Sequence, residues 1–214
     1  MERIELVDAL PAVFAPDGGA GSQVWRREVA LLRGGSYLLS AASGAGKSSL
    51  CGYIFGCRRD YTGRIAFDGT DISTLSQKQW RETRLRHIAY LPQDMMLFPE
   101  LTALENVELK NRLTRHKTGS QIMSLFEELG VADRAHSLAG QISIGQQQRV
   151  AIIRTLCQPF DFIILDEPVS HLDPASNAAA AAVIAREARE RGAGIIATSV
   201  GNDMGLTFDT RLRL

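Results

Sequence analysis

The stretch SGAGKSSL at residues 43–50 decides the fold of this chain. It follows the apolar run SYLLSA and combines glycines, a lysine and two consecutive serines. Glycine lets successive backbone N–H groups turn inward, and the start of a following helix directs a partial positive charge to the same point. We therefore expect a buried strand, a phosphate-binding loop and a helix, in this order.

This loop supplies the expected phosphate and magnesium ligands. Lys47 would reach the β- and γ-phosphates of a nucleotide, and Ser48 would bind Mg²⁺. The usual pattern has a glycine six residues before the lysine, where this chain has Ala41, and that change is costly only if the position needs a positive φ. The alternative is a plain glycine turn before a helix. The predicted ATP-binding residues of the loop are Ala41, Ala42, Ser43, Gly44, Ala45, Gly46, Lys47, Ser48 and Ser49.

A second motif, FIILDEP at 162–168, places two acids at the end of an apolar strand. In an open α/β sheet, ligands bind at the carboxyl ends of the strands. Asp166 suits Mg²⁺, directly or through water, and Glu167 suits orienting and deprotonating an attacking water. The alternative is a strand that ends in two solvated acids, and the phosphate loop makes that alternative less favourable.

Strand and helix patterns alternate along the chain, which predicts an α/β domain with a largely parallel sheet. The region at about 94–157 is mostly helical and looks like an insertion into a core formed by about 1–93 and 158–214. Thr102 with a glutamate three residues later predicts a capping box. Expected strands cover 3–10, 24–32, 36–41, 63–69, 87–93, 161–166, 193–199 and 208–214, and expected helices cover 47–57, 102–113, 119–129 and 173–192.

Composition excludes some classes of protein. Lys+Arg and Asp+Glu both total 24, so the zero net charge argues against a strongly basic nucleic-acid binder. No apolar run reaches the roughly 18 residues of a membrane span, and the first residues lack a signal-peptide pattern. The three cysteines, Cys51, Cys57 and Cys157, are expected to be small buried thiols in a reducing compartment. We expect a cytoplasmic protein.

Between the two motifs stands ISIGQQQRVAIIRTL at 142–156, which resembles the signature of the ATP-binding-cassette (ABC) ATPases. The resemblance continues in YLPQ, which ends at Gln93, in the following LFPELTALENV, in LDEP, and in SHLD at 170–173. Each string alone is a weak to moderate signal. Together, in this order, they cover essentially the whole chain and make the resemblance specific.

This resemblance implies a P-loop NTPase (RecA-like) core with a mostly parallel sheet, N-terminal antiparallel strands and an inserted α-helical subdomain. It implies ATP and Mg²⁺ as ligands, and two cassettes that stack head to tail around two ATP molecules, as a homodimer or with a second ABC subunit. It also implies a membrane-spanning permease subunit as partner, attachment at the inner face of the cell membrane through that permease, and no nucleic acid.

The resemblance assigns further residues. Gln93 would contact Mg²⁺ and the attacking water, and Glu167 would be the general base. Phe14 is expected to stack on adenine, while Trp25 and Tyr37 are expected on strands as structural residues. The signature residues Ser143, Gly145 and Gln146 would contact ATP bound to the opposite subunit, Asp173 belongs to the D-loop, and MMLF at 95–98 would line a groove for the permease or, alternatively, pack in the core.

The chain departs from the family pattern at Ala41, at Ile144, which replaces a signature glycine, and after the last core strand. The family has a γ-phosphate-contacting histidine there, where this chain offers Ser199 and Val200. Loss of one such contact predicts hydrolysis roughly 10- to 100-fold below that of a complete site. The leading hypothesis is an ABC transporter ATPase subunit. The alternatives are a nucleotide-gated module with weak or no hydrolysis and, less favoured, a soluble ABC protein of DNA repair or translation.

Overall fold

The computed structural model describes residues 1–14, 19, 21–42, 44–199 and 205–214. Its centre is a five-stranded sheet in the order β6-β7-β8-β3-β9, in which every neighbouring pair is parallel. The expected parallel α/β core is therefore confirmed, and β9 is an edge strand as predicted. The strands are β3 (Ser36–Ser40), β6 (Ile88–Leu91), β7 (Phe162–Asp166), β8 (Gly194–Ser199) and β9 (Thr210–Arg213).

A second, antiparallel sheet is formed mainly by the N-terminal third, in the order β2-β1-β4-β5. The strand expected at 24–32, β2, is shorter in the structure and begins only at Glu28. The hydroxyl of Ser22 accepts hydrogen bonds from the N–H groups of Val24 and Trp25, so these residues form a turn. Trp25 is thus buried but not on a strand, which corrects the prediction. The strands are β1 (Arg3–Pro11), β2 (Glu28–Leu32), β4 (Tyr61–Phe67) and β5 (Thr70–Asp71).

Helix ends follow the capping signals of the sequence. The predicted capping box of Thr102 is present, and Asp173 caps the last long helix, which ends at the left-handed Gly192. The short α2 was not expected from the sequence, although Ser76 and Gln79 form a capping box at its start. The helices are α1 (Lys47–Phe55), α2 (Gln77–Glu82), α3 (Ala103–Asn111), α4 (Gly119–Glu128), α5 (Ile144–Leu156) and α6 (Pro174–Arg191).

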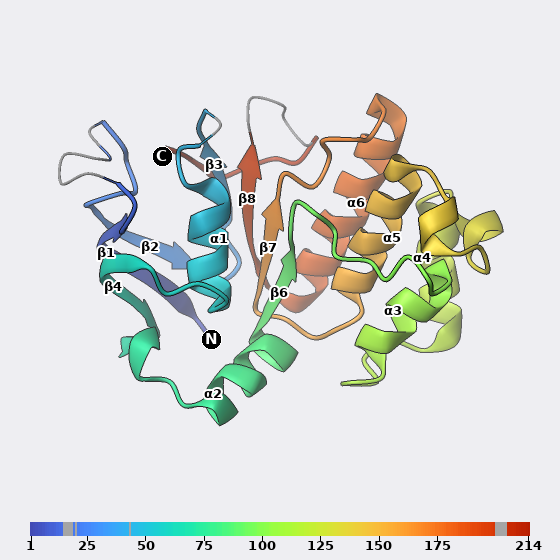
Figure 1. Cartoon of the computed structure of the whole chain (residues 1–214), viewed down its shortest axis with the longest axis horizontal. Helices are drawn as coiled ribbons and strands as arrows, with labels where there is room; N and C mark the ends of the chain where they lie inside the picture. The colour runs from blue at the N-terminus through green and yellow to red at the C-terminus, as the bar shows by residue number, and fades with distance from the viewer. Residues whose placement is uncertain (15–18, 20, 43, 200–204) are drawn as a thin grey trace.

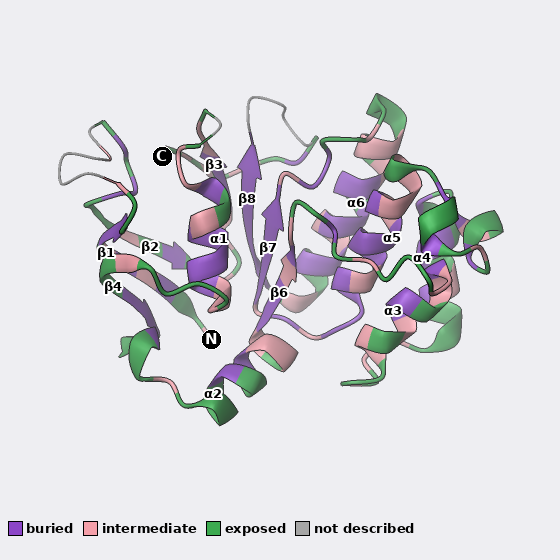
Figure 2. Ribbon diagram, viewed as in Figure 1, coloured by how far each residue is buried: buried purple, intermediate pink, exposed green. Residues whose placement is uncertain are grey.

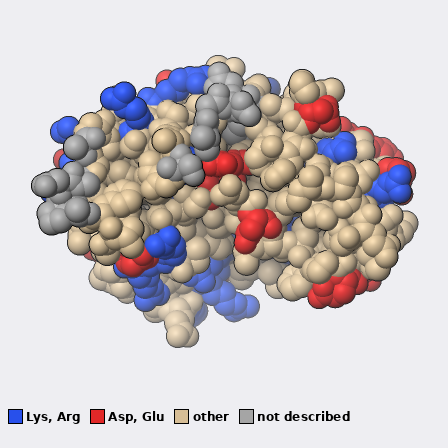
Figure 3. All heavy atoms as spheres, turned by 45° about the horizontal axis from the view of Figure 1, so that its top comes forward, with Lys and Arg blue, Asp and Glu red and all other residues tan. Residues whose placement is uncertain are grey.

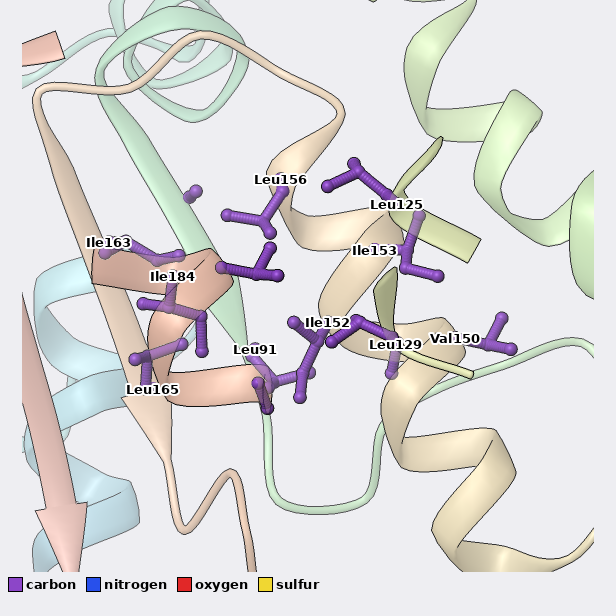
Figure 4. Close-up of a cluster of buried hydrophobic side chains, with 14 of the residues drawn as sticks. Leu91, Leu125, Leu129, Val150, Ile152, Ile153, Leu156, Ile163, Leu165 and Ile184 are labelled. Atoms are coloured by element: carbon purple, nitrogen blue, oxygen red, sulfur yellow. The ribbon is translucent and has the colours of Figure 1, made fainter. Parts of the chain in front are cut away.

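Both faces of the parallel sheet are covered, as the alternation of side chains along β7 shows. Phe162 and Ile164 pack with α1 and the antiparallel sheet, whereas Ile163 and Leu165 pack with α5 and α6. Figure 2 shows the resulting buried layer through the middle of the molecule. Figure 4 shows the cluster of buried side chains around Ile163 and Leu165, where side chains of α4, α5 and α6 meet those of β6 and β7.

A buried ion-pair cluster ties the segment between α3 and α4 to α6. The carboxylate of Glu187 lies 2.9 Å from Lys117 Nζ and 2.8 Å from Arg191 Nη1. Burial raises the pKa of Glu187, but these two cations outweigh that effect and hold its pKa below the usual range. The cluster therefore stabilises the folded chain only while Glu187 is ionised.

In the part of the chain that the structure describes, no helix has the length and apolar character needed to cross a bilayer.

Candidate functional site

The loop between β3 and α1 has the backbone that a phosphate-binding loop requires. Gly44 and Gly46 have φ values of 82° and 89°, which residues with a Cβ rarely adopt. Ala41 is not among the residues with positive φ, so alanine fits this position without backbone strain. The ammonium of Lys47 donates to the carbonyl oxygens of Ala41 and Ala42, at 3.0 and 3.1 Å. Ser43 lies outside the described residues.

Two aromatic residues support this loop from the side of the antiparallel sheet. Trp25 donates its indole N–H to the carbonyl of Ala45, at 3.1 Å. Phe14 packs edge-on against Trp25, with ring centroids 6.4 Å apart, and a Cβ at Gly46 would lie 3.3 Å from the Phe14 ring. Phe14 therefore lies beside the loop, and its stacking on adenine stays a prediction. Trp25 contacts the loop in a way that the sequence did not indicate.

The acidic end of β7 faces the same loop. Asp166 is 1% exposed, and its Oδ1 accepts a hydrogen bond of 2.6 Å from Thr198 on β8. The carboxylate of Glu167 lies 3.5 Å from the ammonium of Lys47 and accepts a hydrogen bond of 3.3 Å from the side chain of Gln93. Three segments far apart in the sequence thus place a cation, an acid and an amide together, because parallel strands end at one edge of the sheet.

A cavity of about 720 Å³ adjoins this edge, and the three predicted magnesium ligands Ser48, Gln93 and Asp166 all line it. Among the described residues, no group of three or more His, Cys, Asp or Glu side chains could hold a metal ion by itself. One carboxylate with neutral oxygen ligands suits Mg²⁺, which usually completes its shell with water and phosphate oxygens. These residues therefore fit a metal that binds together with a nucleotide. Figure 3 turns this edge toward the viewer and shows acidic side chains near the middle of the face.

The signature segment forms the start of α5 and does not join this cavity, since neither Ser143 nor Gly145 lines it. Ser143 caps α5, and it forms a capping box with Gln146. Figure 1 shows α5 and α1 on opposite sides of β7. One chain therefore holds a phosphate loop and a signature at separate places.

Comparison with known proteins agrees with this arrangement. The model of the ABC transporter family matches residues 27–170, which is more than half of the chain. The chain belongs to the ABC transporter family. It is 35% identical to the ABC transporter ATP-binding protein YtrE of Bacillus subtilis over 153 residues, 70% of this chain and 66% of that protein. It is 36% identical to the lipoprotein-releasing system ATP-binding protein LolD 2 of Caulobacter vibrioides over 164 residues, 75% of this chain and 72% of that protein.

Solved structures of ABC cassettes confirm the fold. A putative ABC transporter ATP-binding protein from Pyrococcus furiosus superposes with a TM-score of 0.77 at 22% identity, covering 99% of this chain and 97% of that one. The expected P-loop NTPase core with antiparallel N-terminal strands and a helical insertion is therefore the fold of this chain.

The segment SHLD at 170–173, which resembles the family's D-loop, reaches the cavity at His171, whose backbone N–H donates to the side chain of Gln148. Asp173 accepts hydrogen bonds from the hydroxyl of Ser176 and from the N–H groups of Ser176 and Ala175, and these bonds lower its pKa. His171 contacts the hydroxyl of Ser170 and also lines the cavity. At the position of the family's histidine, Ser199 is 6% exposed, and Val200 lies outside the described residues.

The segment MMLF at 95–98 is partly buried and partly exposed. Met95 packs into the core, whereas Met96 and Phe98 are 64% and 50% exposed. Phe98 lines a hollow of about 230 Å³ together with apolar residues of α3 and the region after it. The hollow also contains two partly buried cations, Lys110 and Arg154, and burial lowers the pKa of each.

The three cysteines are free thiols, and two of them are buried as expected. Burial and the neighbouring Asp166 carboxylate raise the pKa of Cys51, so this thiol stays neutral beneath the phosphate loop. Cys57 is exposed, which corrects its prediction, because α1 ends at Phe55 before reaching it.

The sequence analysis missed two residues that contact the acidic end of β7. Thr198 bridges Asp166 and the N–H of Glu167. Gln148, in the second turn of α5, donates to the carbonyl of Glu167. No local pattern marks either residue, because each contact joins segments that lie apart in the sequence.

Proposed function

We propose that this chain is the ATP-binding and ATP-hydrolysing subunit of an ABC transporter. The observation that carries this function is the convergence of Lys47, Gln93 and Glu167 at the end of the phosphate loop. Lys47 binds the β- and γ-phosphates, and Glu167 accepts a proton from the attacking water that Gln93 helps to orient. Lys47 and Glu167 form an ion pair, so nucleotide binding would have to draw the ammonium toward the phosphates.

Ser48, Gln93 and Asp166 would hold Mg²⁺, which would supply positive charge to stabilise the charge on the phosphates. Phe14, beside the loop, would stack on the adenine. The remaining loop residues, from Ala41 to Ser49, would enclose the phosphates with their backbone N–H groups. These roles rest on the positions of the residues around one cavity and one loop.

We propose that two chains, or this chain and a second ABC subunit, close head to tail. Each complete site then combines the loop of one chain with Ser143, Gly145 and Gln146 of the other. The separation of loop and signature within one chain supports this arrangement, and Asp173 lies in the turn that would face the partner. Ile144 is 49% exposed at the start of α5, where its side chain would meet the other cassette.

The partner in the membrane would be a permease, and the chain would lie peripherally at the cytoplasmic face of the membrane. Exposed apolar residues gather at one place, around the 230 Å³ hollow, which supports a docking site there. They are Phe98, Leu109 and Leu113, which all line the hollow. We assign this surface to the helical subdomain, about residues 94–157, and to its border with the core.

The test is phosphate release from MgATP by the purified protein over a range of protein concentrations. Lys47→Ala serves as the blank for nucleotide binding, and Glu167→Gln should bind ATP but not hydrolyse it. Turnover that rises with protein concentration supports a two-chain site. Turnover that is independent of concentration and unchanged in both variants refutes the proposed function.

A second candidate is a nucleotide-gated module that closes on ATP and hydrolyses it weakly. The observation that favours it is the replacement of the family's histidine, since Ser199 stands there and the last histidine of the chain is His171. This candidate predicts concentration-dependent ATP binding with turnover close to that of the Glu167→Gln variant.

A further inference from the structure

Glu167 has a backbone conformation that side chains rarely adopt. Its φ is 50°, in the left-handed region, directly after β7. Residues held in such conformations need support from their surroundings. Both polar groups of its backbone are held by side chains: the N–H donates to the hydroxyl of Thr198 at 3.1 Å, and the carbonyl accepts from the carboxamide of Gln148 at 3.4 Å.

Gln148 connects both ends of the turn that follows β7. Its side-chain nitrogen reaches Glu167, and its side-chain oxygen accepts a hydrogen bond of 3.0 Å from the backbone N–H of His171. Gln148 is only 2% exposed, so little water is available to replace these bonds. One buried carboxamide thus fixes the segment 167–171.

The same helix touches this turn at a second point. A Cβ on Gly145 would lie 2.9 Å from the carbonyl oxygen of His171, so α5 and the turn pack backbone to backbone there. Ser143, the cap of α5, lies about 1.4 turns before Gln148 on the helix. The start of the signature helix and the segment that carries Glu167 are therefore in direct contact.

We propose that Gln148 is a positioning residue: it holds the backbone of Glu167 so that the carboxylate faces Lys47 and Gln93, and it links this carboxylate to the signature of the same chain. A phosphate bound to that signature by the second cassette would thereby act on Glu167 through α5. The effect of Gln148 on catalysis rests on the proposed function, whereas its role in fixing the turn 167–171 does not.

The experiment compares Gln148→Leu with a matched control, Gln158→Leu. Gln158 is also a buried glutamine, 1% exposed, and its amide donates to the carbonyls of Arg84 and Ile88, both at 3.1 Å. It follows the far end of α5, and its hydrogen bonds go to Arg84, Ile88 and Pro159 rather than to the turn 167–171. Gln148→Glu keeps the acceptor for His171 and removes the donor to Glu167, so it provides a second variant if the leucine variant does not fold.

The first readout is hydrogen exchange of the amides in 167–172, which needs no ATPase activity. We expect exchange to accelerate roughly tenfold or more in Gln148→Leu, and in Gln158→Leu to stay as in the wild type. The second readout is the kinetics with MgATP. We expect kcat to fall roughly 10- to 100-fold while KM changes little, because misplacement of a catalytic group acts on the chemical step.

Unchanged exchange in both Gln148 variants overturns the inference, whatever the activity. Faster exchange with a kcat equal to that of Gln158→Leu overturns the positioning role and leaves a structural one. If the wild-type protein itself releases no phosphate, the proposed function fails, and the exchange data still decide whether Gln148 fixes the turn.

Discussion

Replacing Thr198 by valine tests how the acidic end of β7 is held. Valine has nearly the shape of threonine but no hydroxyl, and Thr198 is fully buried. The hydroxyl donates to the carboxylate of Asp166 at 2.6 Å and accepts from the N–H of Glu167 at 3.1 Å. Both bonds are lost at once, and no other atom of the new side chain can replace them.

The expected loss follows from these two bonds. A hydrogen bond to a charged group contributes about 1.5–3 kcal/mol, and a buried N–H left without a partner costs about 1–3 kcal/mol. The hydrogen bond from the Glu167 N–H to Thr198 is only partly buried, so water offsets some of the cost of leaving this N–H without a partner. We expect the free energy of unfolding to fall by about 3 kcal/mol, which lowers Tm by roughly 6–12 °C in a chain of this size.

The assay is thermal and denaturant unfolding of the wild type, Thr198→Val and Thr198→Ser. Serine keeps the hydroxyl and removes one methyl group, so its expected loss is about 1 kcal/mol. A valine variant as stable as the serine variant would refute the reasoning, because it would mean that the methyl group and not the hydroxyl holds the site together.

Three further predictions concern the rest of the molecule. Gly56→Ala should cost about 1–3 kcal/mol more than Gly69→Ala. Both glycines have positive φ, but only a Cβ at position 56 would clash with the indole ring of Trp80. Urea unfolding of both variants measures the difference. Glu187→Gln should lower the free energy of unfolding by about 3 kcal/mol at neutral pH, since it leaves a buried cation unpaired. Folding lowers the pKa of Glu187 from 4.5. The stabilisation that Glu187 contributes is therefore complete above pH 4.5 and is lost as the pH falls through the folded pKa. The variant lacks this loss, so its free energy of unfolding should depend less on pH on the acid side. Phe98→Ser should release the chain from the membrane fraction of cells that contain its permease, whereas Leu32→Ser, which alters an equally exposed residue on β2, should not; equal retention of both variants would contradict the proposed docking hollow.

Local signals in the sequence were sufficient for most of the fold. The phosphate loop, the parallel strands and the caps at Thr102 and Asp173 depend on neighbours within a few residues, so the sequence shows them directly. The strand β2 was predicted too long, because the apolar residues in 24–32 suggest one continuous strand although the first of them form a turn. That turn is made by the hydroxyl of Ser22, which occupies the N–H groups that a strand would have used.

The site was predicted as a set of residues but not as an arrangement. The motifs identify Lys47, Gln93 and Glu167 one by one, and only the parallel sheet brings their side chains within hydrogen-bonding distance. The left-handed backbone of Glu167 and its two supports could not be foreseen, because they come from β8 and α5.

Three consecutive glutamines show where the sequence stops being informative. The sequence gives no reason to expect different contacts for Gln146, Gln147 and Gln148, apart from the expected place of Gln146 in the signature. In the fold, Gln146 closes a capping box with Ser143, Gln147 donates to carbonyls before the helix, and Gln148 reaches Glu167. Successive side chains on a helix point about 100° apart, so the sequence determines that α5 forms and where it begins, and the packing around it decides which partner each glutamine meets.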